Sequence, residues 1–355
     1  MENVNYPRND TYILIPAYRP DHLLIELLQK LKAKDFDIVV VNDGSGEKYQ
    51  HIFDEAQKYA TVLVQNINRG KGAALRYGFS YVNLHQMNHN YVITCDADGQ
   101  HAIEDIIRVN NKLHETDNVV LGSRKFDKSV PKRSRNGNFM SRLCRTLLTK
   151  EYVRDDQCGL RGFPMQDVFN IISLQGDHYE YEMNVICNLQ IKRLKFEEVP
   201  IETIYLDNNK SSHFKPSLDT FRIQRTIWMN AIVPLVCALL SIALITVLTI
   251  LWPNAGLYTY MFLGLSYLFY FQALMGVTAL MWPTRKMGRR VLVEGIYATI
   301  KIIVVFCLFT ALYEVLHIHA AIAYTIALLF SFLLNFPLAY FAWKVKNRNI
   351  NNKEN

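Results

Sequence analysis

The sequence predicts an α/β domain followed by an all-helical membrane domain, and two patterns lead to this prediction. Up to about Thr226, short strand-like runs alternate with helical runs, and charged and apolar residues are mixed as in a globular domain. After Ile227 the chain is mostly apolar, with charge-free stretches as long as the ~20 residues that cross a bilayer as a helix. We therefore expect a first domain at 1–226 and a second at 227–355 in this chain of 355 residues.

The alternation in the first domain predicts a parallel sheet with helices on both faces. Helical spacing of apolar residues begins at Leu23, and further helices are expected at Gly70–Leu84 and Ile103–Leu113. The strand-like runs are Tyr12–Ile15, Ile38–Val41, Val62–Val64, Tyr91–Thr94 and Val119–Leu121. Because ligands of such folds bind outside the carboxyl ends of the strands, we expect the functional residues there.

The second domain divides into four predicted membrane spans with an uneven distribution of basic residues. The spans are 231–252, 257–282, 291–316 and 320–343. The loop Thr284–Arg290 and the tail Lys344–Arg348 are basic, whereas the loops around Asn254 and His317 hold no Lys or Arg. The positive-inside rule then predicts that both termini and the first domain face the cytoplasm. Buried helices of a soluble protein are the alternative interpretation.

Two charged residues fall inside the third predicted span. Glu294 and Lys301 lie two turns apart on one face of the expected helix. Charges within a bilayer are costly and are often functional. A role with lipid phosphate and a structural pairing within the helix bundle are therefore both open.

Basic residues also gather between Lys125 and Arg154. Beside a membrane domain, this cluster favours phosphate groups or anionic lipid over nucleic acid as the partner, and a solvated surface is the alternative. Within it, Asn138–Leu148 has a basic amphipathic pattern, typical either of a helix lying on a membrane or of a core helix. The six cysteines form no CxxC pair, which argues against a metal cluster or a disulfide framework.

The central chemical motif is Asp96-Ala97-Asp98, at the end of a strand-like run. Two carboxylates one residue apart at a strand end can share a hard divalent cation. Such a cation can bridge the two phosphates of a nucleotide-sugar and stabilise the departing diphosphate. A pair of this kind also occurs in ordinary turns, so its surroundings decide between the two interpretations.

Two other strand ends and one helix start place polar groups at the same edge of the predicted sheet. Asp43 follows the second strand and can accept hydrogen bonds from a base ring. Pro16 and Tyr18 follow the first strand and can line the same pocket. Lys71 stands between two glycines at the start of a helix, where backbone N–H groups and the lysine suit an anion.

Residues 11 to about 215 carry eight segments whose order and spacing resemble those of one known family. The segments are LIPAY, VVVNDGSG, NRGKGAALRYGF, CDADGQH, LGSRKF, DQCGLRGF, YEYE and SSHF. They are similar to the family-2 glycosyltransferases of the dolichyl-phosphate mannose synthase type, whose catalytic domain has a GT-A fold. The four apolar spans resemble the GtrA-like four-helix module that some of these enzymes carry.

The resemblance implies a role for each matching position. The metal, Mg²⁺ or Mn²⁺, would be held by Asp96, Asp98 and Gln100. The nucleotide-sugar would contact Pro16, Tyr18, Asp43, Lys71, Asp96 and Ala97. The acceptor phosphate would bind Arg124, Ser134 and Arg135, and the positions near the sugar and acceptor would be Asp155, Gly159, Leu160, Arg161 and Glu182. The catalytic candidates are Asp98, Arg124 and Arg135.

The chain departs from the family's pattern at two places. Arg19 and Pro20 follow Tyr18, where many relatives have Asn-Glu, so the nucleotide contact of that glutamate is not carried over. Glu47 supplies the second acid of a segment that usually reads DGSxD. The implied nucleotide site therefore rests on the remaining positions.

A phosphate acceptor changes what the site must supply. A phosphate monoester has a second pKa of about 6, so it is largely dianionic at neutral pH and already nucleophilic. The site then needs cations to seat this dianion instead of a dedicated base, and arginines bind phosphate in a bidentate manner. The family analogy implies a single displacement with inversion at the anomeric carbon. Glu180 and Glu182 either serve near the sugar or pack and cap a helix.

These observations predict transfer of one sugar from a UDP- or GDP-sugar to undecaprenyl or dolichyl phosphate at the cytoplasmic face of a membrane. The product would be a lipid-linked sugar for cell-envelope glycosylation. Many Asn and Lys residues favour a bacterial source, hence the plasma membrane and undecaprenyl phosphate. The partners are then the donor, the lipid and the membrane, with no nucleic acid and with a homo-oligomer left open.

Two alternatives to this function remain at the level of the sequence. One is a processive polysaccharide synthase, because Gln224, Arg225 and Trp228 have the residue types of its QxxRW segment, although not the spacing. The other is a non-catalytic lipid-sugar flippase or scaffold, against which the intact Asp96-Ala97-Asp98 argues. Neither of these two segments indicates which sugar is transferred.

Overall fold

The computed structural model describes residues 9–85, 88–124, 139, 141–147, 152–191, 195–202, 236, 238–251, 263 and 300–354. The chain divides into two compact units. The α/β unit comprises Met1–Arg142, Val153–Leu189 and Leu194–Thr226, and the helical unit comprises Leu143–Tyr152, Gln190–Arg193 and Ile227–Asn355. The assignment of 1–226 to the cytoplasm and of 227–355 to a membrane stays a prediction.

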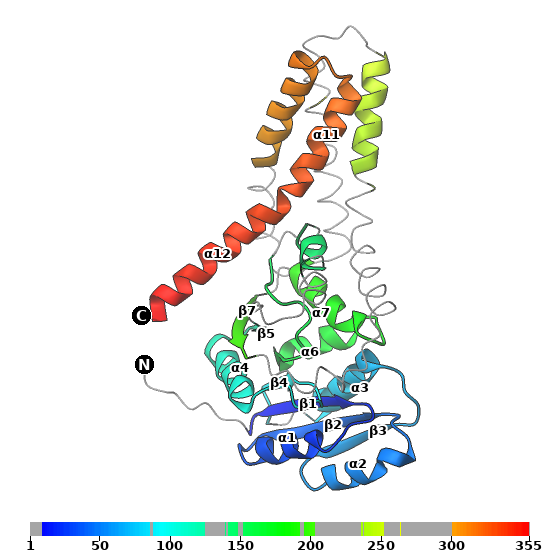
Figure 1. Cartoon of the computed structure of the whole chain (residues 1–355), viewed down its shortest axis with the longest axis vertical. Coiled ribbons are helices and arrows are strands. Elements are labelled where there is room, and N and C mark those ends of the chain that lie inside the picture. Colours follow the sequence, from blue (N-terminus) through cyan, green and yellow to red (C-terminus); the bar gives the residue numbers. More distant parts are fainter. Residues whose placement is uncertain are drawn as a thin grey trace. The chain divides into compact units, whose positions relative to one another are not determined.

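The α/β unit is built on one seven-stranded sheet (Figure 1). The strand order is β3-β2-β1-β4-β6-β5-β7. The strands are β1 Thr11–Ala17, β2 Asp37–Asp43, β3 Thr61–Gln65, β4 Tyr91–Thr94, β5 Val119–Arg124, β6 Arg161–Pro164 and β7 Phe196–Ile201. β1 pairs in parallel with β2 and β4, and β2 pairs in parallel with β3, so the carboxyl ends of these strands meet at one edge. The α/β class and the five strands expected from the sequence are confirmed.

The sheet is mixed, which corrects the expectation of a parallel sheet. β6 lies between β4 and β5 and runs antiparallel to both, while β5 and β7 are parallel. β6 is the short segment Arg-Gly-Phe-Pro, without the β-branched residues that mark a strand in sequence. Its strand conformation depends on pairing with buried neighbours, which no local pattern reveals.

Helices cover both faces of this sheet (Figure 1). They are α1 Leu23–Lys32, α2 Gln50–Ala56, α3 Lys71–Leu84, α4 Ile103–Thr116, α6 Met165–Ile172 and α7 Glu180–Ile191, with the short 3₁₀ turn η1 Glu47–Tyr49. On one face Leu24 of α1 and Ile106 of α4 belong to the same core as Ile13 of β1. On the other face Phe79 of α3 packs in a core with Leu14. Successive residues of β1 thus point to opposite faces, and each fully buried side chain contributes about 1.5–3 kcal/mol.

The described part of the helical unit contains the following elements. They are helical stretches at 143–147 and 300–310, a helix at Ala238–Leu251, the π-helical turn η3 Ala311–Val315, α11 Ala320–Leu333 and α12 Asn335–Glu354. Among the described residues, one continuous helix, Ala320–Lys344, is long and apolar enough to cross a membrane. Leu334 separates α11 from α12 within it, because Pro337 has no N–H to donate to the carbonyl four residues earlier.

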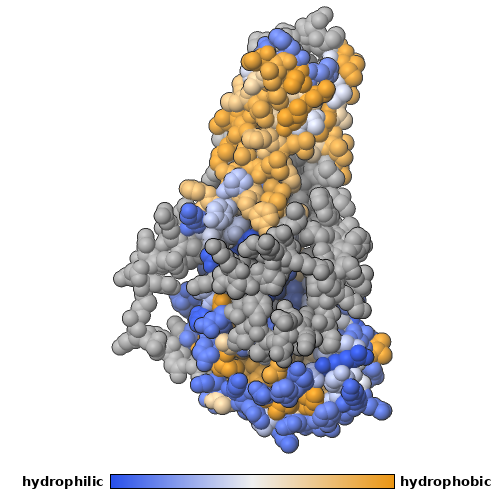
Figure 2. Space-filling view, in the orientation of Figure 1, coloured by the Kyte–Doolittle hydropathy of each residue, from blue (hydrophilic) through white to orange (hydrophobic). Residues whose placement is uncertain are grey.

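The helical unit is apolar outside as well as inside. Tyr324 and Phe309 are fully buried in its core, yet Ile250, Leu329 and Phe341 are each more than 60% exposed. Figure 2 shows apolar residues over most of the coloured surface of this unit. Water disfavours so much exposed apolar surface, whereas lipid tails do not.

The four predicted spans are described only in part. The fourth corresponds to the long helix Ala320–Lys344, and the first overlaps the shorter apolar helix Ala238–Leu251. The span 257–282, except residue 263, and the residue Glu294 lie outside the described residues. Lys301 is buried, and because Glu294 lies outside the described residues, a pairing between the two stays a prediction. The presence of four spans also stays a prediction.

Candidate active site

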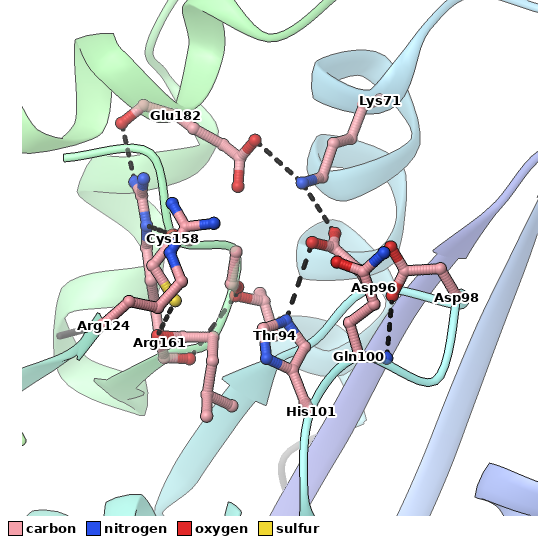
Figure 3. A network of polar contacts seen from close by, with 12 residues as sticks. Lys71, Thr94, Asp96, Asp98, Gln100, His101, Arg124, Cys158, Arg161 and Glu182 are labelled. Atoms are coloured by element: carbon pink, nitrogen blue, oxygen red, sulfur yellow. Dashed lines mark hydrogen bonds and ion pairs between the residues drawn. The ribbon is translucent and has the colours of Figure 1, made fainter. Parts of the chain in front are cut away.

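A lysine joins two carboxylates beside the carboxyl end of β4 (Figure 3). Lys71 is the first residue of α3, and its Nζ lies 2.7 Å from Asp96 Oδ1 and 2.9 Å from Glu182 Oε2. Asp96 follows β4, and Glu182 lies in the first turn of α7. The fold thus brings together three of the sequence-predicted site residues from three separate elements.

The charges of this group stabilise one another. Burial alone would lower the pKa of Lys71, but Asp96 and Glu182 outweigh burial and raise that pKa well above its usual range. Burial would likewise raise the pKa of Asp96, but Lys71 and His101 hold it well below its usual range. Lys71 is therefore a cation, and Asp96 an anion, at neutral pH.

Asp98 has different surroundings from Asp96. Burial and the neighbouring Asp96 carboxylate raise the pKa of Asp98, against the effect of the Gln100 backbone N–H, which donates to Asp98 Oδ1 at 3.1 Å. No ion pair to Asp98 is found among the described residues. Lys71 is shared between Asp96 and Glu182, so these two carboxylates and that of Asp98 leave negative charge that a divalent ion would neutralise.

The donor atoms at this place fit Mg²⁺ or Mn²⁺. The carboxylates of Asp96 and Asp98 and the side-chain amide oxygen of Gln100 are hard ligands, which these ions prefer. Within the described part of the chain, no three His, Cys, Asp or Glu side chains gather in a metal-binding arrangement. The two carboxylates and the amide oxygen leave further ligand positions of such an ion for water and substrate phosphates.

The loop before β6 lies directly against Asp96. A Cβ atom at Gly159 would be 2.5 Å from Asp96 Oδ2, so any larger residue here would displace the Asp96 carboxylate. Thr94 Oγ1 donates to the Gly159 carbonyl at 2.9 Å and ties the loop to β4. His101 Nε2 lies 3.6 Å from Asp96 Oδ2 on the other side. The Asp96 carboxylate is therefore positioned by contacts from several directions.

Asp43 organises the loop that leads into α3. Its Oδ1 accepts from the Arg69 backbone N–H and its Oδ2 from that of Gly70, both at 2.8 Å. Burial raises the pKa of Asp43, and these two hydrogen bonds oppose the rise. Gly70 has φ +100°, and a Cβ there would lie 2.2 Å from His178 Nδ1, so glycine is required. Each Asp43 oxygen keeps a second lone pair for a ligand.

The end of β1 is linked to the turn after β2. Pro16 lies in register with Val41, and the Arg19 guanidinium lies 4.9 Å from the centre of the Tyr18 ring. The Arg19 backbone N–H donates to Ser45 Oγ at 2.9 Å. The hydrogen bond to Ser45 is made by the main chain, so the Arg19 side chain contributes only its contact with the Tyr18 ring.

Arg124 ends β5 and is held by a buried carboxylate. Its Nε donates to Asp155 Oδ2 at 2.6 Å and its Nη2 to Asp155 Oδ1 at 3.1 Å. The Asp155 side chain is 1% exposed, whereas that of Arg124 is 27% exposed. The buried Asp155 carboxylate therefore holds the Arg124 guanidinium in place, while part of the guanidinium stays accessible to solvent. Ser134 and Arg135 lie outside the described residues.

Arg161, the first residue of β6, is 3% exposed. Its Nε donates to the Cys158 carbonyl at 2.9 Å, Nη1 to the Glu182 carbonyl at 2.7 Å and Nη2 to the Asp156 carbonyl at 3.3 Å. Burial raises the pKa of the Cys158 thiol to about 12, so Cys158 is not a thiolate nucleophile. The expected contact of Arg161 with sugar or acceptor stays a prediction.

A cavity of about 710 Å³ lies elsewhere on the α/β unit. Its lining is Gln65, Arg69, Ala73, Arg76, Tyr77, Ser80, Ile172 and Asp177. Arg69 lines this cavity, and its backbone N–H donates to Asp43 Oδ1. We assign the candidate active site to the strand ends because the perturbed charges converge there.

Two residues of this site were not singled out from the sequence. His101 stands inside the segment CDADGQH, so its place beside Asp96 had a signal. Thr94 had none, because its partner Gly159 is 65 residues away and only the folded sheet joins them. Ala97, between the two aspartates, packs against the core.

Known proteins resemble this chain in the part that carries the site. A family model described as glycosyl transferase family 2 matches residues 12–170. An uncharacterised protein of Methanocaldococcus jannaschii is 34% identical over 212 residues, which are 58% of this chain and 85% of that protein. The chain belongs to glycosyl transferase family 2, and it is a glycosyltransferase.

Two named relatives are enzymes with lipid phosphate in their names. A UDP-N-acetylglucosamine–dolichyl-phosphate N-acetylglucosaminyltransferase of Methanococcus voltae is 28% identical, over 55% of this chain and 86% of that enzyme. A dolichyl-phosphate beta-glucosyltransferase of Trichomonas vaginalis is 28% identical, over 59% of this chain and 72% of that enzyme. The resemblance of the four spans to a GtrA-like module stays a prediction.

Proposed function

We propose that this glycosyltransferase moves one sugar from a nucleotide-sugar to a polyprenyl phosphate at a membrane surface. The observation that carries the proposal is the pairing of two kinds of group on either side of β6. The acidic pair Asp96 and Asp98 follows β4, and the carboxylate-anchored Arg124 ends β5. An acidic pair suits a metal-bound diphosphate, and a partly exposed arginine suits a phosphate acceptor.

The donor is proposed to lie along the ends of β1, β2 and β4. Asp43 would accept hydrogen bonds from the base, with Pro16 and Tyr18 beside it. Lys71 would attract the diphosphate and keep Asp96 ionised, since its Nζ already lies 2.7 Å from that carboxylate. Mg²⁺ or Mn²⁺ held by Asp96, Asp98 and Gln100 would act as a Lewis acid toward the departing nucleoside diphosphate.

The acceptor is proposed to be a phosphate dianion that needs no general base. A phosphate oxygen attacks the anomeric carbon, and the bond from this carbon to the diphosphate oxygen breaks with inversion, its electron pair leaving with the nucleoside diphosphate. Arg124 would seat the dianion, held in direction by Asp155, with Ser134 and Arg135 of the basic segment beside it. Glu182 is engaged by Lys71 at 2.9 Å, which fits a supporting role better than that of a base.

The acceptor class is supported by the two named relatives. Their names share dolichyl phosphate and differ in the sugar, so the lipid phosphate is the feature carried over and the sugar is left open. We favour undecaprenyl phosphate and a bacterial plasma membrane, because of the Asn- and Lys-rich composition. The helical unit would hold the enzyme in the bilayer, with four spans and both termini cytoplasmic.

The proposal is tested with the purified full chain in detergent. Labelled UDP- and GDP-sugars are offered one at a time with undecaprenyl phosphate or dolichyl phosphate and Mn²⁺. We expect one donor to give a labelled lipid carrying a single sugar, and Asp98→Ala to give none. A labelled polymer would favour a processive synthase, and the absence of any lipid-linked sugar across the panel would contradict the proposal.

A further inference from the structure

Arg161 is a buried cation whose hydrogen bonds go to main-chain carbonyls. It is 3% exposed, and no carboxylate forms an ion pair with it in the described part of the chain. A buried charge is strongly unfavourable unless hydrogen bonds replace its hydration. The three carbonyls of Asp156, Cys158 and Glu182 supply that replacement. Without these three hydrogen bonds, the buried Arg161 guanidinium would strongly destabilise the fold.

The three carbonyls come from two separate segments, and Figure 3 labels one residue of each, Cys158 and Glu182. Asp156 and Cys158 belong to the loop before β6, and Glu182 belongs to the first turn of α7. A guanidinium is a rigid plane with donors in fixed directions, so it sets the positions of its acceptors relative to one another. Arg161 thus joins the loop to the helix in one geometry.

Each of these two segments is also linked to Asp96, the loop directly and α7 through Lys71. The Glu182 carboxylate binds Lys71, which binds Asp96. On the other side, Gly159 of the loop lies against the Asp96 carboxylate, where even a methyl group would meet Oδ2 at 2.5 Å. The position of Asp96 therefore depends on two contacts whose mutual spacing Arg161 determines.

We propose that Arg161 is a positioning residue for the donor site, which sets Asp96 for the metal-bound diphosphate without contacting the acceptor. The inference rests on the proposed donor site, and it differs from the role near sugar and acceptor that the resemblance implies. The two roles separate cleanly in a measurement made without any lipid. A positioning role for Asp96 changes nucleotide binding, whereas an acceptor contact leaves nucleotide binding unchanged.

The test measures Mn²⁺-dependent binding of UDP and of GDP to the full chain in detergent, by titration calorimetry without lipid. Arg161→Lys keeps the charge but not the planar fork, so we expect affinity for the preferred nucleotide to fall about 10-fold. Arg108→Lys is the control for the loss of a guanidinium that binds a main-chain carbonyl, since Arg108 Nη1 donates to the Pro200 carbonyl at 2.6 Å and pairs with Asp105, not with Asp96 or Asp98. We expect this control to bind the nucleotide like the wild type.

A second variant covers the case in which Arg161→Lys does not fold. Gly159→Ala adds a methyl group against Asp96 from the loop side, and we expect a similar loss of nucleotide affinity at an unchanged melting temperature. Unchanged nucleotide affinity in a folded Arg161→Lys or Gly159→Ala would overturn the positioning role. A wild-type chain that binds neither nucleotide with Mn²⁺ would instead contradict the donor half of the proposed function.

Discussion

The α/β unit and the helical unit distribute their apolar residues in opposite ways. In the α/β unit Leu14 and Phe79 are at most 1% exposed, in the core that helices cover on one face of the sheet. In the helical unit Leu329 and Phe341 are 61% and 67% exposed, although the same unit also has a buried core. Burial of apolar surface from water accounts for the first arrangement but not for the second.

The difference is what we expect if lipid surrounds the helical unit and water surrounds the α/β unit, an assignment that stays a prediction. An outward apolar surface is stable where lipid replaces water, so the helical unit is suited to a bilayer. The described charges that suit chemistry, from Asp96 to Arg124, belong to the α/β unit. Substitutions in the two units should therefore have different effects, the largest at the acidic pair.

Asp98→Ala tests whether the chemistry depends on the acidic pair. We expect sugar transfer to fall about 10³-fold, because the loss of one carboxylate weakens binding of an ion that stabilises the leaving group by several kcal/mol. Removing the metal with EDTA should have a similar effect, reversed by Mn²⁺. The assay is formation of labelled lipid-linked sugar. Activity within about tenfold of wild type would place the chemistry elsewhere.

Leu329→Lys and Val64→Lys test the surroundings of the two exposed surfaces. Both positions are more than half exposed, Leu329 on α11 and Val64 on β3. A lysine facing lipid costs about 2.5–3.5 kcal/mol, whereas a surface change facing water usually stays within about 0.5 kcal/mol. We therefore expect Leu329→Lys to reduce the yield from membranes and Val64→Lys to leave it unchanged. Equal tolerance of both would argue against a bilayer around α11.

Arg124→Lys tests the acceptor side of the α/β unit. Lysine keeps the charge but loses the bidentate geometry toward Asp155 and toward phosphate, so we expect KM for the lipid phosphate to rise about 10-fold. KM for the nucleotide-sugar should change little. Steady-state kinetics with each substrate varied in turn separates the two. A rise in the nucleotide-sugar KM alone would move Arg124 to the donor side.

Loss of one tyrosine hydroxyl in each unit gives the smallest expected effect. Tyr181 Oη donates to the Ile171 carbonyl at 2.9 Å in the α/β unit, and Tyr324 Oη donates to Ser241 Oγ at 3.4 Å in the helical unit. We expect Tyr181→Phe to cost about 1 kcal/mol, because a buried hydrogen bond is lost while the Leu174 N–H still donates to the same carbonyl at 3.1 Å. Tyr324→Phe should cost about 0.6 kcal/mol, the average for such bonds between membrane helices. Thermal unfolding of both variants in the same detergent measures the difference, and a larger cost for Tyr324→Phe would reverse the comparison.

The parts of the fold that were predicted correctly have local signals. The alternating runs from Tyr12 to Leu121 predicted five strands, because each strand carries its own β-branched and apolar residues. The motif Asp96-Ala97-Asp98 was recognised at a strand end from adjacent residues alone. β6 was not predicted, since Arg161 and Gly162 give it no strand pattern and its neighbours β4 and β5 are far away in sequence.

By itself, the sequence determined the α/β class of the first unit, the apolar character of the second and the acidic pair at the end of β4. Each of these features depends on residues that are close together in sequence. The spacing of their apolar or acidic side chains is enough to predict it. Tertiary structure alone decided that Lys71 joins Asp96 to Glu182 and that Arg161 is buried against three carbonyls. The contacts of Lys71 with Asp96 and Glu182, and of Arg161 with Glu182, join elements that are more than 20 residues apart. Only packing around a shared core brings such elements within hydrogen-bonding distance.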